Sequence, residues 1–210
     1  MMNPDTDPVA VTSVTSQVPL ANGAGQLPPD AGQVLLPLAR PAIAAELGIE
    51  RRARDDVPWL KQHAACFITL TQGEKLRGCI GTLRPHRPLG EDVRANAVAA
   101  AFRDPRFKPL SAVEFEGISL EISVLSALEP LLFSDENDAL RQLRAGIDGV
   151  VFEYGHHSST FLPQVWETMK DSIEFLAHLK YKAGLPPDFW DREVKLARYT
   201  ATKWREEDKA

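Results

Sequence analysis

The residues best suited to chemistry lie in one hexapeptide, Leu76-Arg77-Gly78-Cys79-Ile80-Gly81. Cys79 brings a thiol whose nucleophilicity depends on a lowered pKa, and Arg77 brings a planar guanidinium that can bind a carboxylate or phosphate. Glycine weakens a strand, so Gly78 and Gly81 mark either a tight bend packed against a helix or a close approach of a ligand to the bare backbone. Because an arginine and a thiol flank the same glycine, we favour a ligand site made by Arg77, Gly78 and Gly81.

The hexapeptide lies in a basic stretch of an acidic chain. The 210 residues have a formal net charge of −5, whereas residues 75–108 hold eight cations and three anions, a net charge of +5. Such a stretch can attract a phosphate, a carboxylate or an acidic partner, and Arg106 is one of its candidate ligand-binding residues. The alternative is that these side chains are solvated and spread over several faces.

Two further positions could belong to the same chemistry. In the run His156-His157-Ser158-Ser159-Thr160, His157 is a candidate base for a Cys79 nucleophile, and Thr160 is a candidate ligand contact. If Gln72-Gly73 is a two-residue turn, Cys66 lies opposite Cys79, at the ~4.5–5.5 Å spacing of cross-strand neighbours. That pair would be a redox-sensitive dithiol, a partial soft-metal site or two small buried hydrophobes, and we favour the buried interpretation for Cys66.

The sequence lacks the motifs that are typical of several other kinds of site. The chain has no Cys-x-x-Cys, His-Glu-x-x-His, Gly-x-Gly-x-x-Gly, P-loop or Gly-x-Ser-x-Gly pattern, so we predict no metal site and identify no cofactor. The basic stretch offers only Phe102 and Phe107 for stacking on bases, which disfavours nucleic acid as a partner. Two cysteines make no disulfide framework, and no apolar run approaches the ~20 residues that span a bilayer.

Apolar periodicity predicts the elements that position these residues. Helices are expected over residues 34–47, 89–102, 135–143 and 171–184, with a short one opened by a capping box of Ser111 and Glu114. Strands are expected over residues 65–70, 75–83, 118–124, 150–154, 158–162 and 193–203. Because the strands arrive in hairpins, the fold class is α+β, a mainly antiparallel sheet flanked by helices.

The first 32 residues differ from the rest in composition. They are rich in proline and glycine, and no lysine or arginine precedes Arg40. Such a segment buries too little apolar surface to offset its ordering entropy, so we expect a disordered tail over residues 1–32 and a folded domain over residues 33–206. The segment matches neither a secretory signal nor a mitochondrial presequence, and the expected location is the cytoplasm.

Four motifs occur in a familiar order: the hexapeptide with Thr82-Leu83, then Asp104-Pro105-Arg106-Phe107, Leu120-Glu121-Ile122-Ser123-Val124-Leu125 and Thr160-Phe161-Leu162-Pro163-Gln164-Val165-Trp166. From about Leu35 to Trp204 the chain resembles the AMMECR-domain family, called AmmeMemoRadiSam system protein A in bacteria. The resemblance implies an α+β unit with two lobes and a cleft between them. It also implies a functional hexapeptide and two partners, a Memo-like protein and a radical-SAM enzyme. This chain departs from the family at residues 156–159, where similar sequences often carry basic residues and a glycine.

Two functions remain from these observations, and the sequence does not decide whether the chain is an enzyme. The first is an accessory or binding protein of uncharacterised activity that recognises an anionic small molecule or partner at Leu76–Gly81. The second is a thiol-dependent enzyme that uses Cys79 as nucleophile, His157 as base and Arg77 to hold an anionic substrate.

Overall fold

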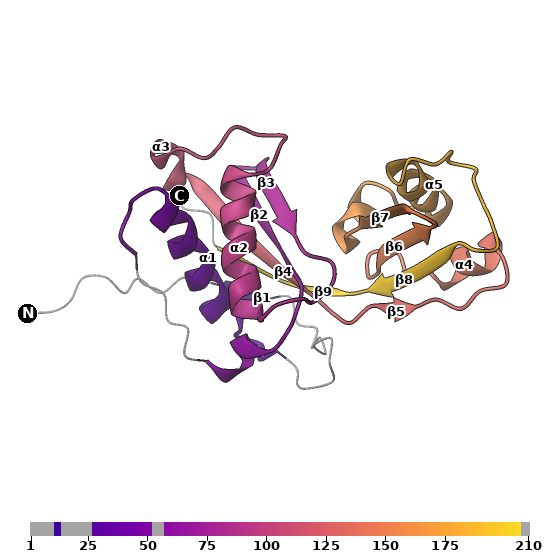
Figure 1. The fold of residues 1–210 in the computed structure, drawn as a ribbon, viewed down its shortest axis with the longest axis horizontal. Helices are drawn as coiled ribbons and strands as arrows, with labels where there is room; N and C mark the ends of the chain where they lie inside the picture. The colour runs from indigo at the N-terminus through magenta and orange to yellow at the C-terminus, as the bar shows by residue number, and fades with distance from the viewer. Residues whose placement is uncertain (1–10, 14–26, 52–56, 207–210) are drawn as a thin grey trace, which may run out of the picture. The chain divides into compact units, whose positions relative to one another are not determined.

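The computed structural model in Figure 1 describes residues 11–13, 27–51 and 57–206. The chain divides into two compact units: the first runs up to Leu125 and resumes at Thr202, and the second is Ser126–Ala201. Each unit has its own buried apolar cluster. The two units are therefore described one at a time.

The first unit is built on a five-stranded sheet. Its strands, in spatial order, are β1 (Val11–Ser13), β9 (Ala201–Glu206), β4 (Ile118–Leu125), β2 (Cys66–Gln72) and β3 (Lys75–Gly81). Strand β2 pairs antiparallel with both β3 and β4, and β1 pairs antiparallel with β9. The strand that carries the hexapeptide, β3, is thus an edge strand.

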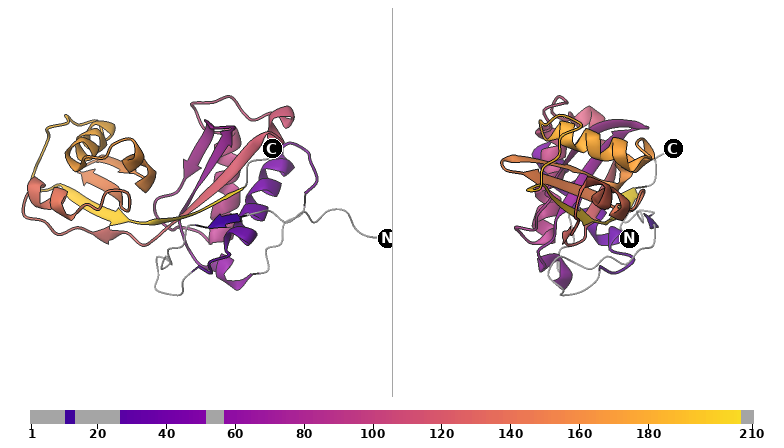
Figure 2. Two further views of the ribbon diagram at one scale, coloured as in Figure 1. Left: turned by 180° about the vertical axis from the view of Figure 1, so that it is seen from behind. Right: turned by 90° about the vertical axis from the view of Figure 1, so that its right-hand side faces the viewer.

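Two long helices bury the apolar residues of this sheet. They are α1 (Gly32–Glu46) and α2 (Leu89–Phe102), and the described helical turns of the unit also include η1 (Pro58–Lys61) and α3 (Ala112–Phe115). In Figure 1 helix α2 crosses in front of β2 and β3, and the view from behind in Figure 2 shows these strands in front of the helix. The strand residues on the helix side, such as Ile68 and Leu120, are fully buried.

Local sequence signals account for these helices. Helix α2 has the predicted bounds, and Ser111 and Glu114 form the predicted capping box at the start of α3. Helix α1 begins earlier than predicted and contains both Pro37 and Pro41. Both prolines lie inside the helix, because its buried apolar face outweighs the missing N–H donors.

The second unit is a four-stranded antiparallel sheet with its own helices. Its strands, in spatial order, are β5 (Glu129–Pro130), β8 (Lys195–Tyr199), β6 (Gly149–Tyr154) and β7 (His157–Phe161). The helical segments are α4 (Glu136–Gln142), η2 (Pro163–Glu167) and α5 (Ser172–Lys182). Phe175 of α5 stacks on Trp166 with ring centroids 3.8 Å apart, and both belong to the buried apolar cluster of this unit.

The α+β class predicted from the sequence is confirmed, but one strand prediction is wrong. Residues 193–203 form two strands rather than one, and the two belong to different sheets. The break lies at Thr200, whose N–H donates to Ser126 Oγ and whose carbonyl accepts from Ser126 N–H, both at 2.9 Å. The buried residues are Val194, Leu196 and Tyr199 before the break and Thr202 and Trp204 after it, so the period of two slips between Leu196 and Tyr199 and again between Tyr199 and Thr202.

Most of the predicted tail, residues 1–32, lies outside the described residues. Within it the structure describes β1, whose backbone pairs with β9, and residues 27–32, where Leu27 and Ala31 are buried. The disorder expected for the rest stays a prediction. No helix in the described ranges is long and apolar enough to cross a bilayer.

Candidate functional site

The register of the first hairpin decides what lies beside Cys79. Gln72 pairs with Lys75, so the turn is Gly73-Glu74, with Gly73 in the left-handed region at φ +58°. An irregularity between Leu70 and Thr71 then shifts the register by one further residue. Cys79 is therefore opposite Thr69 rather than Cys66.

The predicted pairing of Cys66 with Cys79 is thus wrong. Cys66 pairs with Val124 on the other side of β2, and its N–H donates to Asp92 Oδ2 at 2.9 Å. Burial raises the pKa of its thiol well above the usual value. Cys66 is a buried packing residue, as the sequence favoured, and Cys79 is half-buried.

The two glycines of the hexapeptide pack against protein atoms. A Cβ at Gly78 would clash with the carbonyl oxygen of Ala100 on α2, and a Cβ at Gly81 would clash with the ring of Phe67. Backbone and ring are rigid neighbours, so neither position has room for a side chain. Internal packing is sufficient to explain both glycines, which favours the first of the two interpretations raised by the sequence.

Cys79 lies on the face of β3 that points away from α2. Side chains alternate along a strand, and the clash at Gly78 fixes that residue on the helix side. On the opposite face the hydroxyl of Thr69 donates to Cys79 Sγ at 3.5 Å. The thiol thus has one hydroxyl donor from the neighbouring strand.

The outer edge of β3 at Cys79 is occupied by two side chains. Cys79 N–H donates to Asp104 Oδ2 at 2.9 Å, and Arg106 Nη2 donates to the carbonyl of Cys79 at 3.3 Å. Arg106 also donates to both oxygens of Asp104, at 2.9 and 2.7 Å. We call Asp104 and Arg106 the edge clamp, because together they take the place of a neighbouring strand.

The edge clamp joins a buried acid to an exposed base. The side chain of Asp104 is 2% exposed and that of Arg106 is 54% exposed. The hydrogen bonds from Arg106, with those from the backbone of Cys79 and Arg106, hold the pKa of Asp104 far below its usual range. Hydrogen bonding to Asp104 likewise raises the pKa of Arg106.

Further cations surround this clamp. Within residues 103–108, here called the basic loop, Arg103, Arg106 and Lys108 are exposed and Asp104 is the one acid. Arg106 neutralises that acid, and neither Arg103 nor Lys108 forms an ion pair with a residue in the described part of the chain. The loop therefore has a net positive charge next to Cys79.

Arg77 has a different environment from the one the sequence suggested. Its Nε and Nη2 donate to Glu114 at 3.0 and 3.3 Å, which fastens β3 to the capping box of α3. The bonds from Arg77, followed by those from Ser111, lower the pKa of Glu114 to about 2. The guanidinium also lies 5.9 Å from the ring centroid of Phe107. Its Nη1 is buried, and it has no hydrogen-bond partner among the residues that the structure describes.

His157 and Thr160 belong to the second unit, on β7. His157 Nδ1–H donates to the carbonyl of Ala183 at the end of α5, at 2.8 Å. Thr160 Oγ1 lies 2.9 Å from both the carbonyl of Val150 and the hydroxyl of Tyr199, whose pKa is raised by burial to about 12. Both side chains have partners in their own unit, and a catalytic role for His157 with Cys79 stays a prediction.

The structure thus gathers Arg77, Gly78, Cys79 and Arg106 at one sheet edge. Sequence reasoning missed Asp104, although the motif Asp104-Pro105-Arg106-Phe107 contains it. An acid two residues before an arginine, with proline between them, is a turn signal that could have pointed to the pair. Within the described ranges, no group of three or more histidine, cysteine, aspartate or glutamate residues could hold a metal ion.

A second polar cluster lies near Cys66, around the fully buried carboxylate of Asp92. The carboxylate of Asp92 accepts hydrogen bonds from Cys66 N–H, Thr82, Asn96 and Arg87. Both carboxylate oxygens of Asp92 accept hydrogen bonds from the protein. Asp92 therefore has a structural role, in which it joins α2 to β2.

Comparison with known proteins gives consistent matches over both units. The AMMECR1 family model matches residues 36–204. A protein of Methanothermobacter thermautotrophicus is 39% identical over 183 residues, which cover 85% of this chain and 95% of that protein. Protein MJ0810 of Methanocaldococcus jannaschii is 43% identical over 145 residues, which cover 67% of this chain and 72% of that protein.

A solved structure shares the fold. The crystal structure of the uncharacterised protein PH0010 from Pyrococcus horikoshii matches with a TM-score of 0.78 and 36% sequence identity, covering 85% of this chain and 93% of that one. The sequence matches and the shared fold therefore both relate this chain to the same group of proteins.

Proposed function

The chain belongs to the AMMECR1 family, and from this premise we propose that it is an accessory or binding protein that recognises an anionic group at the edge of its first sheet. The recognised group is a carboxylate or phosphate of a small molecule, or the acidic surface of a partner. The observation that supports this function most is the basic loop, in which the cations Arg103 and Lys108 have no acidic partner among the described residues, next to Cys79.

The edge clamp gives this loop a fixed position. Arg106 is held along the Nε–Nη2 edge of its guanidinium, by Asp104 and by the carbonyl of Cys79, so its exposed side is oriented before any ligand arrives. Preorganisation of this kind reduces the entropy lost on binding. Arg77 contributes indirectly, since it and Arg106 both lie against the ring of Phe107 within the same loop.

The proposal is tested by titrating the full chain with inorganic phosphate and with succinate, followed by ¹⁵N chemical shifts. We expect both anions to shift the amides of residues 103–108 and Cys79. The double variant Arg103→Glu with Lys108→Glu should weaken binding roughly tenfold or more, because two attractive charges become repulsive. Lys61→Glu, an exposed lysine of the same unit, is the matched control and should change the affinity less than about twofold. Equal weakening by the control would show that only the overall charge matters and would refute the site.

The proposed protein partners are a Memo-like protein and a radical-SAM enzyme. The support is that the four motifs resemble a family whose bacterial members are one part of a three-component set with these two proteins. Mixing purified proteins and following complex formation by size exclusion tests this point. The charge-reversal variant should elute as the free chain if the basic loop carries the contact, whereas Lys61→Glu should still enter the complex.

One observation also supports the second candidate, a thiol-dependent enzyme. Cys79 Sγ accepts a hydrogen bond from Thr69, and Arg106 Nη2 donates to the backbone carbonyl of the same cysteine. A hydroxyl donor and a guanidinium are groups that stabilise a thiolate. Loss of any turnover in Cys79→Ser with retained anion binding would favour the enzyme, and unchanged turnover would exclude Cys79 as the nucleophile.

A further inference from the structure

The exposed arginine of the edge clamp has only part of its guanidinium left for a ligand. Arg106 Nε and Nη2 donate to the two carboxylate oxygens of Asp104, and Nη2 also donates to the carbonyl of Cys79. A guanidinium has five N–H groups, so the two on Nη1 are left over. Because both N–H groups of Nη2 are used, Arg106 has no pair of parallel N–H groups with which to bind a carboxylate.

Arg106 is the third residue of a closed β-turn. Phe107 N–H donates to the carbonyl of Asp104 at 3.1 Å, so residues 104–107 form the turn and Pro105 is its second residue. Proline has a fixed φ that suits this position. The turn and the edge clamp together hold in place an arginine whose side chain is 54% exposed.

Two further cations flank this turn. Arg103 and Lys108 lie one residue outside it, at its two ends. Leu110 N–H donates to the carbonyl of Ala101 at 2.8 Å, which closes the base of the loop beyond both cations. Because the ends of a β-turn lie within about 7 Å of each other, Arg103 and Lys108 start from neighbouring points of the backbone. One ligand can therefore reach both side chains.

The net charge of the loop selects among anions. Its three cations and one acid leave a net charge of +2, and the adjacent ion pair of Arg77 with Glu114 adds none. A single carboxylate carries one negative charge, whereas a phosphate monoester carries about 1.5 to 2 at pH 7. The phosphate monoester therefore balances the loop more fully.

We propose that the basic loop binds a phosphate monoester in preference to a carboxylate. This inference rests on the function proposed above and names its ligand. The three free oxygens of the phosphate point in different directions, so each can accept a hydrogen bond from a separate cation: Nη1 of Arg106, Arg103 and Lys108. The two oxygens of a carboxylate suit a fork of parallel donors, and in Arg106 that fork is occupied by Asp104.

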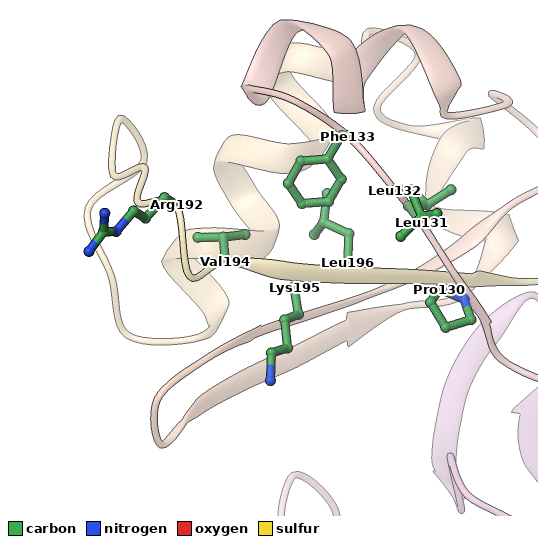
Figure 3. Close-up of a pocket in the computed structure, with 8 residues that line it drawn as sticks. All are labelled: Pro130, Leu131, Leu132, Phe133, Arg192, Val194, Lys195 and Leu196. Carbon is green, nitrogen blue, oxygen red and sulfur yellow. The ribbon is translucent and has the colours of Figure 1, made fainter.

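The groove of the second unit differs from the basic loop in the arrangement of its cations. Arg192 and Lys195 line this open groove of about 360 Å³ (Figure 3). In Figure 3 Lys195 lies on the opposite side of β8 from Val194 and Leu196, and Arg192 extends in another direction. These two cations therefore do not converge on one ligand.

The ligand preference is measured on the full chain by ¹⁵N chemical shifts at pH 7.5 and constant ionic strength. The probes are phenyl phosphate, benzoate and phthalate, which share an aryl ring. We expect phenyl phosphate to bind at least roughly tenfold more tightly than benzoate. Phthalate has two carboxylates and thus the charge of the phosphate without its geometry, and it should bind at least about threefold more weakly than phenyl phosphate.

Neutral variants show which cations hold the phosphate. Arg103→Gln and Lys108→Gln each remove one cation and leave the edge clamp intact. Each should weaken binding of phenyl phosphate about fivefold or more, and binding of benzoate by a smaller factor. Lys61→Gln, at an exposed position of the same unit, is the matched control and should change either affinity less than about twofold.

A short phosphoserine peptide and its unphosphorylated counterpart distinguish the two sources of such a ligand. Tighter binding of the phosphopeptide than of phenyl phosphate assigns the site to a phosphorylated side chain of a protein. Equal affinities assign it to a small phosphorylated molecule. Equal binding of the two peptides would count against a role for the phosphate.

The results that overturn this inference differ from those that overturn the proposed function. If phenyl phosphate binds no more tightly than phthalate or benzoate, the preference for phosphate is wrong while an anion site on the loop remains. If none of the three probes shifts the amides of residues 103–108, or if Lys61→Gln causes losses equal to those of the loop variants, the anion site itself is refuted.

Discussion

The backbone N–H of Cys79 and the guanidinium of Arg106 meet on a single buried carboxylate, that of Asp104, at distances of 2.9 and 2.7 Å. The hexapeptide is therefore fixed to the basic loop by an interaction between residues 25 positions apart in the chain. Any change in that carboxylate should affect both the sheet edge and the orientation of the exposed arginine.

Replacing Asp104 by alanine should destabilise the first unit. The change leaves the N–H of Cys79 without its acceptor and removes the partner of Arg106, at a cost of about 1–3 kcal/mol in the free energy of unfolding. Urea denaturation measures it. Arg141→Ala, which breaks an exposed ion pair with Asp138, is the control and should leave the midpoint unchanged. A stable Asp104→Ala protein would show that the edge clamp contributes little.

Acid should weaken the link between β3 and α3. The pKa of Glu114 is lowered from 4.5 to about 2 in the folded protein, so its contribution is complete above pH 4.5 and is lost as the pH falls towards 2. Urea unfolding between pH 5 and pH 2.5 should show this loss, and Glu114→Gln should reduce the slope. Glu50→Gln, at an exposed position of the same unit, should keep the slope of the unaltered chain.

A methyl group at Gly78 should be poorly tolerated. Gly78→Ala places a Cβ against the backbone of α2, and overpacking of this kind costs about 1–3 kcal/mol or more. Thermal unfolding compares it with Gly117→Ala, where the nearest neighbour of a Cβ, the carbonyl oxygen of Glu114, is 3.6 Å away and little change is expected. If Gly78→Ala were as stable as the original chain but failed to bind anions, the glycine would serve the ligand rather than the packing.

The two thiols should differ strongly in reactivity. Cys79 is half-buried and Cys66 is fully buried with a raised pKa, so iodoacetamide should modify Cys79 first. Mass spectrometry of a time course at pH 7.5 should show one rapid addition, absent from Cys79→Ser. Rapid modification of both thiols would contradict the packing around Cys66.

Local patterns predicted much of this fold. The bounds of α2 follow from its apolar spacing, and the capping box of α3 from two residues three positions apart. The strand Ile118–Leu125 follows from simple alternation. These features depend on neighbours in the chain, which is why a single sequence contains the information.

The rest depended on distant contacts. Cys79 lies opposite Thr69 because of the turn position and an irregularity in β2, and neither changes the apolar pattern. The role of Asp104 depends on the loop folding back onto β3, and the partner of Arg77 depends on where α3 comes to lie. The structure thus adds protein partners for Arg77 and Arg106 that the sequence did not indicate, and their role towards a ligand stays a prediction.

Ser126 and Thr200 are hydrogen-bonded to each other although they lie at opposite ends of the second unit. Their two hydrogen bonds, each 2.9 Å long, bring the start and the end of the second unit together. A segment with adjoining ends is a modular insertion: it can be deleted, exchanged between relatives or replaced by a short linker without stretching the host chain. The first unit is formed by the chain on both sides of this segment, and residues 126–201 form a domain inserted into it.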